Sequence, residues 1–377
     1  MIYMDNAATM PMKEVAIQEM QRCIKEVYAN PSAAYRLASK ARSEVHNART
    51  EIAKCIGADT EEIIFTSSGS EANSLAIQGY VNAVSSKGNH IIVSTIEHSS
   101  VLENIKRLQR QGYNISYIKP DKEGIVSVEA IKKAICDETI LVSVMYANNE
   151  IGSIQPIQEI GELLKNTEIV FHTDAVAAAG YIDINVNRDN IDLLSVSGHK
   201  VGGPAGTGFL YKRKSVVIES MILGGEQENG YRAGTENVAG IVAMRAAFVQ
   251  ACQTLEEQTT LLRHNQQYML EMLRKEIPSV IINGSLEKRL PGNIHISIPG
   301  ISADRMLMYL DMEGICVSSG AACMNRKHMP SYVMKEIGAE AYEEGALRLT
   351  LSVENTREEI DFVVRVLRKN IEVCITG

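Results

Sequence analysis

The sequence lacks the features that mark membrane, disulfide-rich and nucleic-acid-binding proteins. No apolar run approaches the ~20 residues of a membrane helix, and the N-terminal Met1-Ile-Tyr-Met-Asp5 is too short and too acidic for a signal peptide. The seven cysteines are scattered, odd in number and never spaced as Cys-x-x-Cys, which argues against a disulfide framework or a zinc ribbon. A net charge of -8 argues against nucleic acid as the main ligand. We therefore expect a cytoplasmic protein with no metal, membrane or nucleic-acid partner.

The length and the hydrophobic pattern predict two domains of the α/β class. The chain has 377 residues, of which 45% are hydrophobic, enough for two cores. In the first part, strands alternate with helices, which predicts a mostly parallel sheet with right-handed crossovers. The expected strands are 62–66, 90–95, 115–119, 140–146, 168–173 and 191–196, and the expected helices are 14–28, 37–55, 71–84, 101–110, 128–136 and 157–164.

A long helical region over about residues 237–277 is predicted to link this part to a compact α+β unit, with the boundary near residue 255. The glycine-rich, polar stretch 224–235 is predicted to be a functional loop. In the second unit we expect strands 281–283, 293–298, 315–318 and 346–352, and helices 303–312, 331–337 and 357–369.

Unusual polar residues follow four of the predicted strands. In a parallel sheet, the carboxyl ends of the strands meet at one edge, and ligands bind there. We therefore expect one site formed by Glu97-His98, Asn148-Asn149-Glu150, His172-Thr173-Asp174 and His199-Lys200.

Lys200 is the candidate for covalent chemistry. It follows an apolar strand and precedes Gly202, Gly203, Gly206 and Gly208, so the backbone there can approach a ligand closely. A partly desolvated amine becomes nucleophilic, and its usual carbonyl partner in proteins is pyridoxal phosphate. The alternative is a solvated lysine beside a glycine-rich turn.

Pyridoxal phosphate needs further partners, and the sequence has candidates for each. Asp174 can keep the pyridine nitrogen protonated, and His98 can cover one face of the ring. The turn Ser67-Ser-Gly-Ser70, between a strand and a helix, is typical of phosphate sites, although many such turns are rich in serine and glycine for conformational reasons alone. An aspartate at a strand end can instead be a helix cap, and a lone histidine can be structural. The phosphate candidates are Gly69, Ser70 and Ser197.

Cys323 and Arg348 are the candidates in the second unit. Cys323 lies in a polar stretch with three cationic or titratable neighbours, which can lower the pKa of its thiol, whereas we expect the other six cysteines to be buried and inert. Arg348 interrupts an apolar strand. It is either an edge-strand charge that faces solvent or a bidentate ligand for a carboxylate. The neighbours of the cysteine are Arg326, Lys327 and His328.

With these motifs, nearly the whole chain resembles the cysteine desulfurases of the class V aminotransferase family, which supply sulfur for iron-sulfur clusters. The resemblance rests on motifs that occur in the family's order. They are Tyr3-Met-Asp-Asn-Ala-Ala-Thr9, Asn30-Pro-Ser32, Phe65-Thr-Ser-Ser-Gly-Ser-Glu-Ala-Asn73, Glu97-His98, Asn148-Asn-Glu-Ile-Gly152, His172-Thr-Asp174, Ser195-Val-Ser-Gly-His-Lys200, Arg232-Ala-Gly-Thr235, Ser318-Ser-Gly-Ala-Ala-Cys323 and Arg348.

The resemblance implies a homodimer of the type I pyridoxal-phosphate fold. Residues 15–255 would form the large domain around a mixed seven-stranded sheet, and residues 1–14 and 256–377 the small α+β domain with a mobile cysteine loop. The implied reaction moves sulfur from L-cysteine to Cys323, with L-alanine as product, and then to an acceptor protein.

The resemblance also implies a role for each site residue. Lys200 forms the Schiff base, Asp174 pairs with the pyridine nitrogen, His98 stacks on the ring and acts in catalysis, and Arg348 binds the substrate carboxylate. Asn149 lies near the ring hydroxyl and the substrate. The implied phosphate ligands are Gly69, Ser70, Ser197, His199 and, from the other subunit, Thr235.

Departures from the family pattern leave alternatives open. Ala177 stands where the family has a glutamine that donates to the ring oxygen, and its loss should raise the pKa of the Schiff base. Glu226 replaces a glycine, and Ser70 replaces the common threonine. A selenocysteine lyase, or an enzyme for another β-substituted amino acid, is one alternative. A degenerate, non-catalytic scaffold is another, although Lys200, Cys323 and Arg348 are all present.

Overall fold

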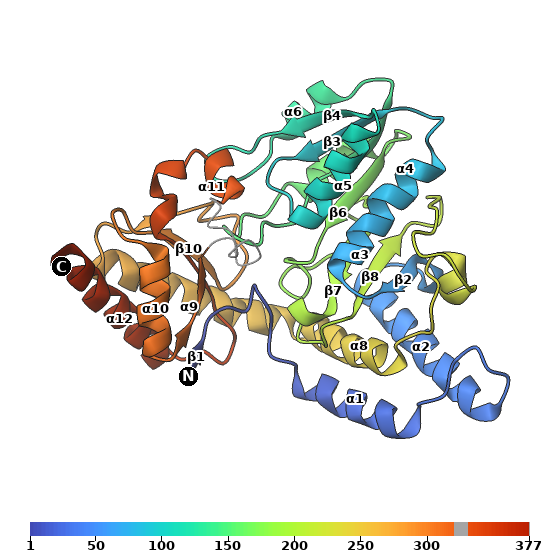
Figure 1. The fold of residues 1–377 in the computed structure, drawn as a ribbon, viewed down its shortest axis with the longest axis horizontal. Helices are drawn as coiled ribbons and strands as arrows, with labels where there is room; N and C mark the ends of the chain where they lie inside the picture. The colour runs from blue at the N-terminus through green and yellow to red at the C-terminus, as the bar shows by residue number, and fades with distance from the viewer. Residues whose placement is uncertain (320–330, 377) are drawn as a thin grey trace.

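A seven-stranded mixed sheet is the centre of the larger part of the molecule (Figure 1). The structure is a computed structural model that describes residues 1–319 and 331–376. The strand order is β2-β8-β7-β6-β5-β3-β4, and only β8 runs antiparallel to its neighbours. The strands are β2 (Ile63–Thr66), β3 (His90–Ser94), β4 (Asn114–Ile118), β5 (Thr139–Ser143), β6 (Val170–Asp174), β7 (Leu193–Ser197) and β8 (Gly208–Lys212).

Helices cover both faces of this sheet, which explains why its inner strands are apolar runs rather than alternating patterns. In β3, Ile92 belongs to the same buried cluster as residues of α2 (Arg36–Cys55), α6 (Val128–Ala134), α7 (Ile157–Leu164) and α8 (Val238–Gln253). Its neighbours Ile91 and Val93 pack instead with α5 (Ser99–Arg110) and with the helical run α3 (Gly69–Ser74), π turn (Leu75–Gly79) and α4 (Tyr80–Ala83). Both faces of the strands are therefore buried, and the strand ends are left to bind ligands.

Strand β8 was not predicted. Glycines at positions 202, 203 and 206 precede it, and no element was assigned there, yet Phe209, Leu210 and Tyr211 are buried in the sheet. Because β8 pairs antiparallel with both β2 and β7, the sheet is mixed, as the family resemblance implied.

A second core lies around a four-stranded antiparallel sheet with the order β12-β13-β10-β9. Its strands are β9 (Ile281–Ile282), β10 (Asn293–Ser297), β12 (Ser318–Ser319) and β13 (Ala346–Thr350). Beside it, β1 (Ile2–Tyr3) pairs parallel with β11 (Ile315–Cys316), and Met4 is buried in the same core. The N-terminal residues thus pack with the C-terminal third of the chain (Figure 1). The domain limits at residues 14 and 255 stay predictions.

Helices α9 (Leu255–Glu276), α10 (Ala303–Met312) and α12 (Arg357–Thr376) pack on this second core. The remaining helices are α1 (Glu14–Glu26) and α11 (Tyr332–Glu336).

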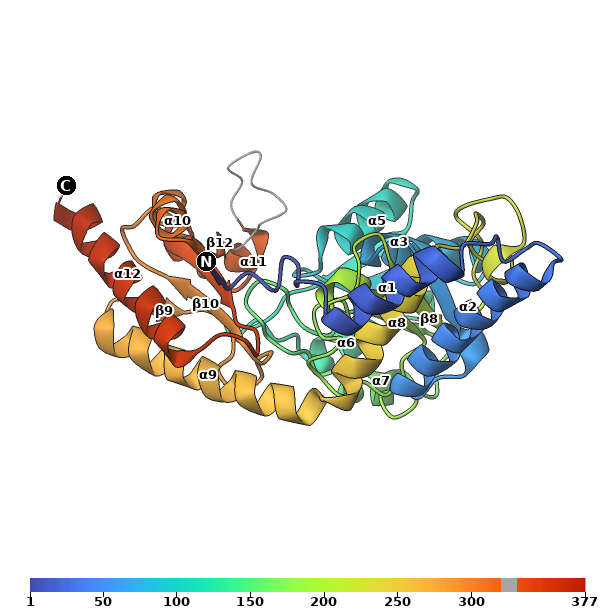
Figure 2. The ribbon, with the colours of Figure 1, turned by 90° about the horizontal axis from the view of Figure 1, so that it is seen from below.

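The helical region predicted over 237–277 is present, and it is divided into two helices. Two helices, α8 and α9, meet at Thr254 with a bend of 72°. Buried residues of α8 belong to the first core and those of α9 to the second, so the bend follows from two separate surfaces to cover (Figure 2). Within the described residues no single helix is long and apolar enough to span a membrane, and only this bent pair passes the same test when taken together.

Candidate active site

A cavity of about 430 Å³ lies between the two sheets. Its wall includes residues that follow β2, β3, β5, β6 and β7, and residues of β13 from the other sheet. Thr235 is exposed and does not line it, and Cys323 with its neighbours Arg326, Lys327 and His328 lies outside the described residues. The predicted site residues that line the cavity are Gly69, Ser70, His98, Asn149, Asp174, Ser197, His199, Lys200 and Arg348.

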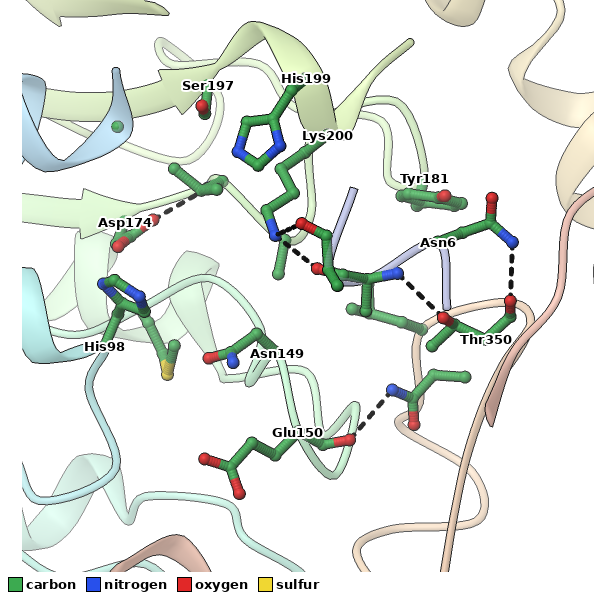
Figure 3. A pocket seen from close by; sticks show the side chains of 18 of the residues that line it. Asn6, His98, Asn149, Glu150, Asp174, Tyr181, Ser197, His199, Lys200 and Thr350 are labelled. Carbon is green, nitrogen blue, oxygen red and sulfur yellow. Dashed lines mark hydrogen bonds between the residues drawn. The ribbon is translucent and has the colours of Figure 1, made fainter. Parts of the chain in front are cut away.

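Lys200 projects into this cavity from the short helical turn Gly198–Lys200, directly after β7. Its Nζ donates hydrogen bonds to the carbonyl oxygens of Ala7 and, at 2.8 Å, Ala8. These contacts come from the N-terminal segment, which forms the opposite wall (Figure 3). The amine is thus half-buried among neutral acceptors, as a lysine that forms a Schiff base needs.

Asp174 ends β6 and is held as a buried carboxylate beside the cavity. Its Oδ2 accepts a hydrogen bond from Asn73 Nδ2 at 2.7 Å, and its Oδ1 accepts one from the backbone amide of Val176 at 2.9 Å. A carboxylate has about four lone-pair positions, so capacity remains for another donor. The arrangement suits a protonated ring nitrogen.

His98 lies at the first turn of α5, where it has a structural role as well as a place in the cavity wall. Its Nδ1 accepts a hydrogen bond from the backbone amide of Ser100 at 3.1 Å and lies 2.8 Å from Ser100 Oγ. The amide contact fixes the ring and leaves Nδ1 without a proton. In Figure 3 the rings and chains of His98, Asp174 and Lys200 surround one space.

The turn after β2 and the end of β7 form a tight, polar side of the cavity. A Cβ on Gly69 would lie 2.6 Å from Val176 Cγ2, so only glycine lets this backbone pack so closely. Ser70 and Ser197 add hydroxyl groups nearby. Burial, with a smaller effect of Lys200, lowers the pKa of His199 to about 4, so its imidazole is neutral at neutral pH. This side therefore offers donors for a phosphate.

Arg348 is not an edge-strand residue. Strand β13 is paired on both sides, with β10 and β12, and Arg348 is buried. Its Nη1 donates to the carbonyl oxygen of Asn149 at 3.1 Å, and its Nη2 forms an ion pair with Asp5 at 3.0 Å. Within the described residues its Nε has no hydrogen-bond partner. A buried guanidinium with an unpaired donor at a cavity wall suits the carboxylate of a substrate.

Two buried acids lie at this wall: Glu150 lines the cavity, and Glu97 lies behind the lining residues. Burial, with a smaller contribution from Asp174, raises the pKa of Glu97 to about 8, and burial also raises the pKa of Glu150. Glu97 Oε1 accepts from Ser94 Oγ at 2.5 Å and from the amide of Met145 at 2.7 Å. Glu97 is therefore protonated at neutral pH.

Taken together, the donors fit pyridoxal phosphate and an amino acid. An amine, a fixed carboxylate, an imidazole, a cradle that excludes a Cβ and an unpaired guanidinium donor line the same cavity. Ala177 also lines it, so the departure from the family glutamine lies within the site.

Several contacting residues were not predicted. Asn73 holds Asp174, Asp5 pairs with Arg348, and the carbonyls of Ala7 and Ala8 bind Lys200. All four lie in motifs of the sequence, yet their partners are far away along the chain, and no local pattern indicates such contacts.

Comparisons with known proteins agree with this geometry. The family model for aminotransferase class-V matches residues 2–363. A protein of Clostridium botulinum named cysteine desulfurase IscS is 46% identical over 374 residues, which cover 98% of this chain and 94% of that protein. The putative cysteine desulfurase IscS 1 of Bacillus subtilis is 42% identical over 361 residues and 95% of each chain.

Solved structures give the same result. A NifS-like protein superposes with a TM-score of 0.93 at 32% identity, over 99% of both chains. The structure described as SspA in complex with cysteine has a TM-score of 0.83 at 32% identity, over 94% of this chain and all of that one. The fold, the cavity and these similarities therefore all indicate the same protein family.

Proposed function

Since the chain belongs to the aminotransferase class-V family, we propose that it is a cysteine desulfurase that uses pyridoxal phosphate to remove sulfur from L-cysteine and release L-alanine. One observation carries this proposal. Lys200, Asp174 and His98, from three separate strand ends, share one cavity with Arg348, which comes from the other sheet. That set provides a site for the cofactor and a site for an α-carboxylate.

Each residue has a distinct task in this proposal. Lys200 holds the cofactor through its amine and then carries a proton on Nζ between substrate atoms. Asp174 keeps a proton on the pyridine nitrogen, and His98 orients the ring by lying against it. When bound, pyridoxal phosphate supplies an electron sink for the electrons released at the substrate Cα. Arg348 orients the amino acid through its carboxylate.

Asn149 and the phosphate ligands complete the proposed site. Asn149 lines the cavity near the substrate position, and its backbone carbonyl accepts from Arg348. The phosphate ligands are the tight turn at Gly69 and Ser70, together with Ser197 and His199.

We propose Cys323 as the group that receives the sulfur. Its thiol loses a proton, and the thiolate attacks the sulfur atom of L-cysteine. The C–S bond of the substrate breaks, an S–S bond forms, and the substrate Cβ gains a hydrogen. The thiolate becomes a persulfide while the carbon is reduced, so atoms and electrons balance and no further oxidant is needed. An acceptor protein then takes the sulfur.

The test is to incubate the purified holoenzyme with L-cysteine and a thiol reductant and to measure alanine and sulfide. We expect equal amounts of both products, and loss of both in Cys323→Ala. A matched control is Cys136→Ala. Cys136 is exposed, so the expectation that it would be buried is wrong; it does not line the cavity, and its loss should leave turnover unchanged. Alanine formation that survives in Cys323→Ala would remove the persulfide step. A wild-type protein that binds the cofactor and forms no alanine would instead support the degenerate scaffold.

We also propose a homodimer in which Thr235 serves the cavity of the partner subunit. Thr235 is exposed and lies outside the cavity of its own chain. The same loop exposes 86% of Leu223, an apolar side chain that a second subunit can cover. Light scattering measures the mass, and mixed dimers of Thr235→Ala with an inactive Lys200→Ala subunit test which cavity the residue serves.

Ala177 favours one second candidate, a preference for selenocysteine or another β-substituted amino acid. Turnover of L-selenocysteine and L-cysteine in direct competition decides between them.

Five described cysteines are free thiols, which supports a reducing compartment, and we therefore place the proposed activity in the cytoplasm.

A further inference from the structure

The carboxylate of Asp5 bridges two parts of the second sheet at the cavity wall. Its Oδ1 accepts from Arg348 Nη2 at 3.0 Å, and its Oδ2 accepts from Ser318 Oγ at 2.7 Å. Ser318 begins β12 and lies five residues before Cys323 in the sequence. One side chain therefore connects the guanidinium at the substrate end of the cavity with the strand that precedes the predicted sulfur acceptor.

The backbone around Asp5 is held firmly. Asp5 forms a parallel bridge with Thr350, and the amide of Ala7 donates to Thr350 Oγ1 at 2.8 Å. Asn6 Nδ2 donates to the carbonyl oxygen of Thr350 at 2.7 Å, as Figure 3 shows. Because the segment is fixed at these points, the Asp5 carboxylate can fix the position of its two partners.

The burial of the charged Arg348 side chain explains why it needs the Asp5 carboxylate as a partner. The side chain of Arg348 is only 3% exposed and that of Asp5 16%. A buried cation without a partner turns toward any available acceptor, and Asp5 prevents this by balancing the charge and holding Nη2. Nε of Arg348 remains without a partner among the described residues and can serve a ligand.

We propose that Asp5 is a positioning residue for the carboxylate subsite. One of its oxygens orients Arg348 for the substrate carboxylate, and the other sets the position of Ser318, so carboxylate capture and the strand before Cys323 share one anchor. This inference rests on the proposed function, because it takes an α-amino acid as the substrate.

The first experiment compares two ligands that do not react at sulfur, L-alanine and ethylamine, which is alanine without its carboxylate. Their binding to the holoenzyme is followed through the visible absorbance of the cofactor. We expect Asp5→Ala to weaken L-alanine by about tenfold or more, the size of one charge-assisted hydrogen bond, and to leave ethylamine unchanged. Asp5→Asn keeps an acceptor for Arg348 and a polar atom for Ser318 but loses the charge, so it should recover part of the loss seen in Asp5→Ala.

A matched control separates orientation from general loss of stability. Asp192 also accepts from an arginine, Arg213 Nε at 2.8 Å, and from a second donor, the amide of Phe171 at 2.9 Å. It lies near the opposite ends of β6 and β7 and does not line the cavity. Asp192→Ala should lower the melting temperature without a change in the affinity for L-alanine.

A separate variant tests the hydrogen bond between Ser318 and Asp5. Ser318→Ala removes the contact with Oδ2 and keeps the ion pair, so we expect the affinity for L-alanine to stay the same and the kcat for L-cysteine to fall by about threefold or more, the size of one neutral hydrogen bond. An unchanged kcat would overturn the role of Ser318.

Three outcomes with Asp5 would overturn the positioning role. They are unchanged or tighter L-alanine binding in Asp5→Ala, an equal loss in Asp5→Ala and Asp5→Asn, and an equal loss for L-alanine and ethylamine. Failure of the proposed function looks different: the wild-type protein then forms no alanine from L-cysteine, whereas the binding comparison can still be made.

Discussion

The two sheets present their functional side chains in different ways. The seven-stranded sheet carries Lys200, Asp174 and His98 just beyond or at the carboxyl ends of strands. The four-stranded antiparallel sheet carries Arg348 in the middle of a strand that is hydrogen-bonded on both sides. Both sets face the same cavity.

The difference follows from how each sheet is covered. Parallel strands are buried on both faces by helices, so only their ends are free to meet a ligand. The antiparallel sheet has one side toward its own core and the other toward the cavity, so a side chain in mid-strand can reach a ligand. In our proposal the first sheet supplies the chemistry and the second recognises the carboxylate.

Removing the side-chain amine of Lys200 is the strongest test of the proposal that the seven-stranded sheet supplies the chemistry. Lys200→Ala should reduce alanine formation by at least ~10³-fold, because among the described residues that line the cavity no other lysine can hold the cofactor and carry the proton. The loss should be the same for every amino acid tried. The measurement is single-turnover alanine formation, together with the visible spectrum. A lysine-linked absorbance band that persists in the variant would contradict the role of Lys200.

Removing the guanidinium should have a smaller and more selective effect. Arg348→Ala should raise the KM for L-cysteine by about 10- to 100-fold, the size expected for charge-assisted hydrogen bonds, with a lesser change in kcat. Arg348→Lys keeps the charge without the paired donors and should recover only part of the loss. A large fall in kcat at an unchanged KM would contradict the proposal that Arg348 serves to bind the substrate carboxylate.

Glu97, a buried acid that follows β3, should make the free energy of unfolding depend on pH. The pKa of Glu97 in the folded protein is about 8, above its ordinary value of 4.5, so the folded state holds a proton that the unfolded state releases. Its contribution is complete below pH 4.5 and is lost as the pH rises to 8, by about 1.4 kcal/mol per pH unit.

Glu97→Gln removes this dependence, because the amide stays neutral. We expect the variant to gain stability relative to wild type as the pH rises from 5 to 8, measured by urea unfolding at several pH values. His199 behaves differently from Glu97. Its pKa is lowered from 6.5 to about 4, so it affects the stability of the folded state only below about pH 6.5. Parallel pH curves for wild type and variant would show that Glu97 is ionised in the folded protein.

The smallest effect should come from Ala177. Ala177→Gln would return a donor to the cavity beside the proposed ring oxygen, lowering the pKa of the Schiff base and changing the turnover of L-cysteine by only a few-fold. A pH titration of the visible absorbance measures the shift. No shift would place position 177 too far from the ring oxygen to affect it.

The sequence predicted the strands of both sheets apart from β8, and for the large sheet it also predicted the edge at which ligands bind. Apolar runs such as Ile91-Ile92-Val93 identify buried parallel strands, and polar residues after them identify the ligand edge, so the meeting of His98, Asp174 and Lys200 at one cavity could be anticipated. Their roles remain predictions, as does that of Cys323.

Other features had no local signal. Strand β8 followed too many glycines to be recognised, and the bend at Thr254 has no proline or glycine to mark it. The ion pair of Asp5 and Arg348 joins residues 343 positions apart, and an arginine in mid-strand gives no indication of which carboxylate it will meet. Long-range pairs of this kind depend on the tertiary fold alone.

The pairing of β1 with β11 has a consequence for biosynthesis. Ile2 pairs with Ile315, a partner that the ribosome makes 313 residues later, roughly 15 to 60 s at ordinary elongation speeds. Until then β1 lacks its partner strand, and the contacts of Asn6 and Ala7 with Thr350 cannot form. The nascent chain can thus complete its large sheet early, while the catalytic pocket acquires its last wall only when translation is nearly over.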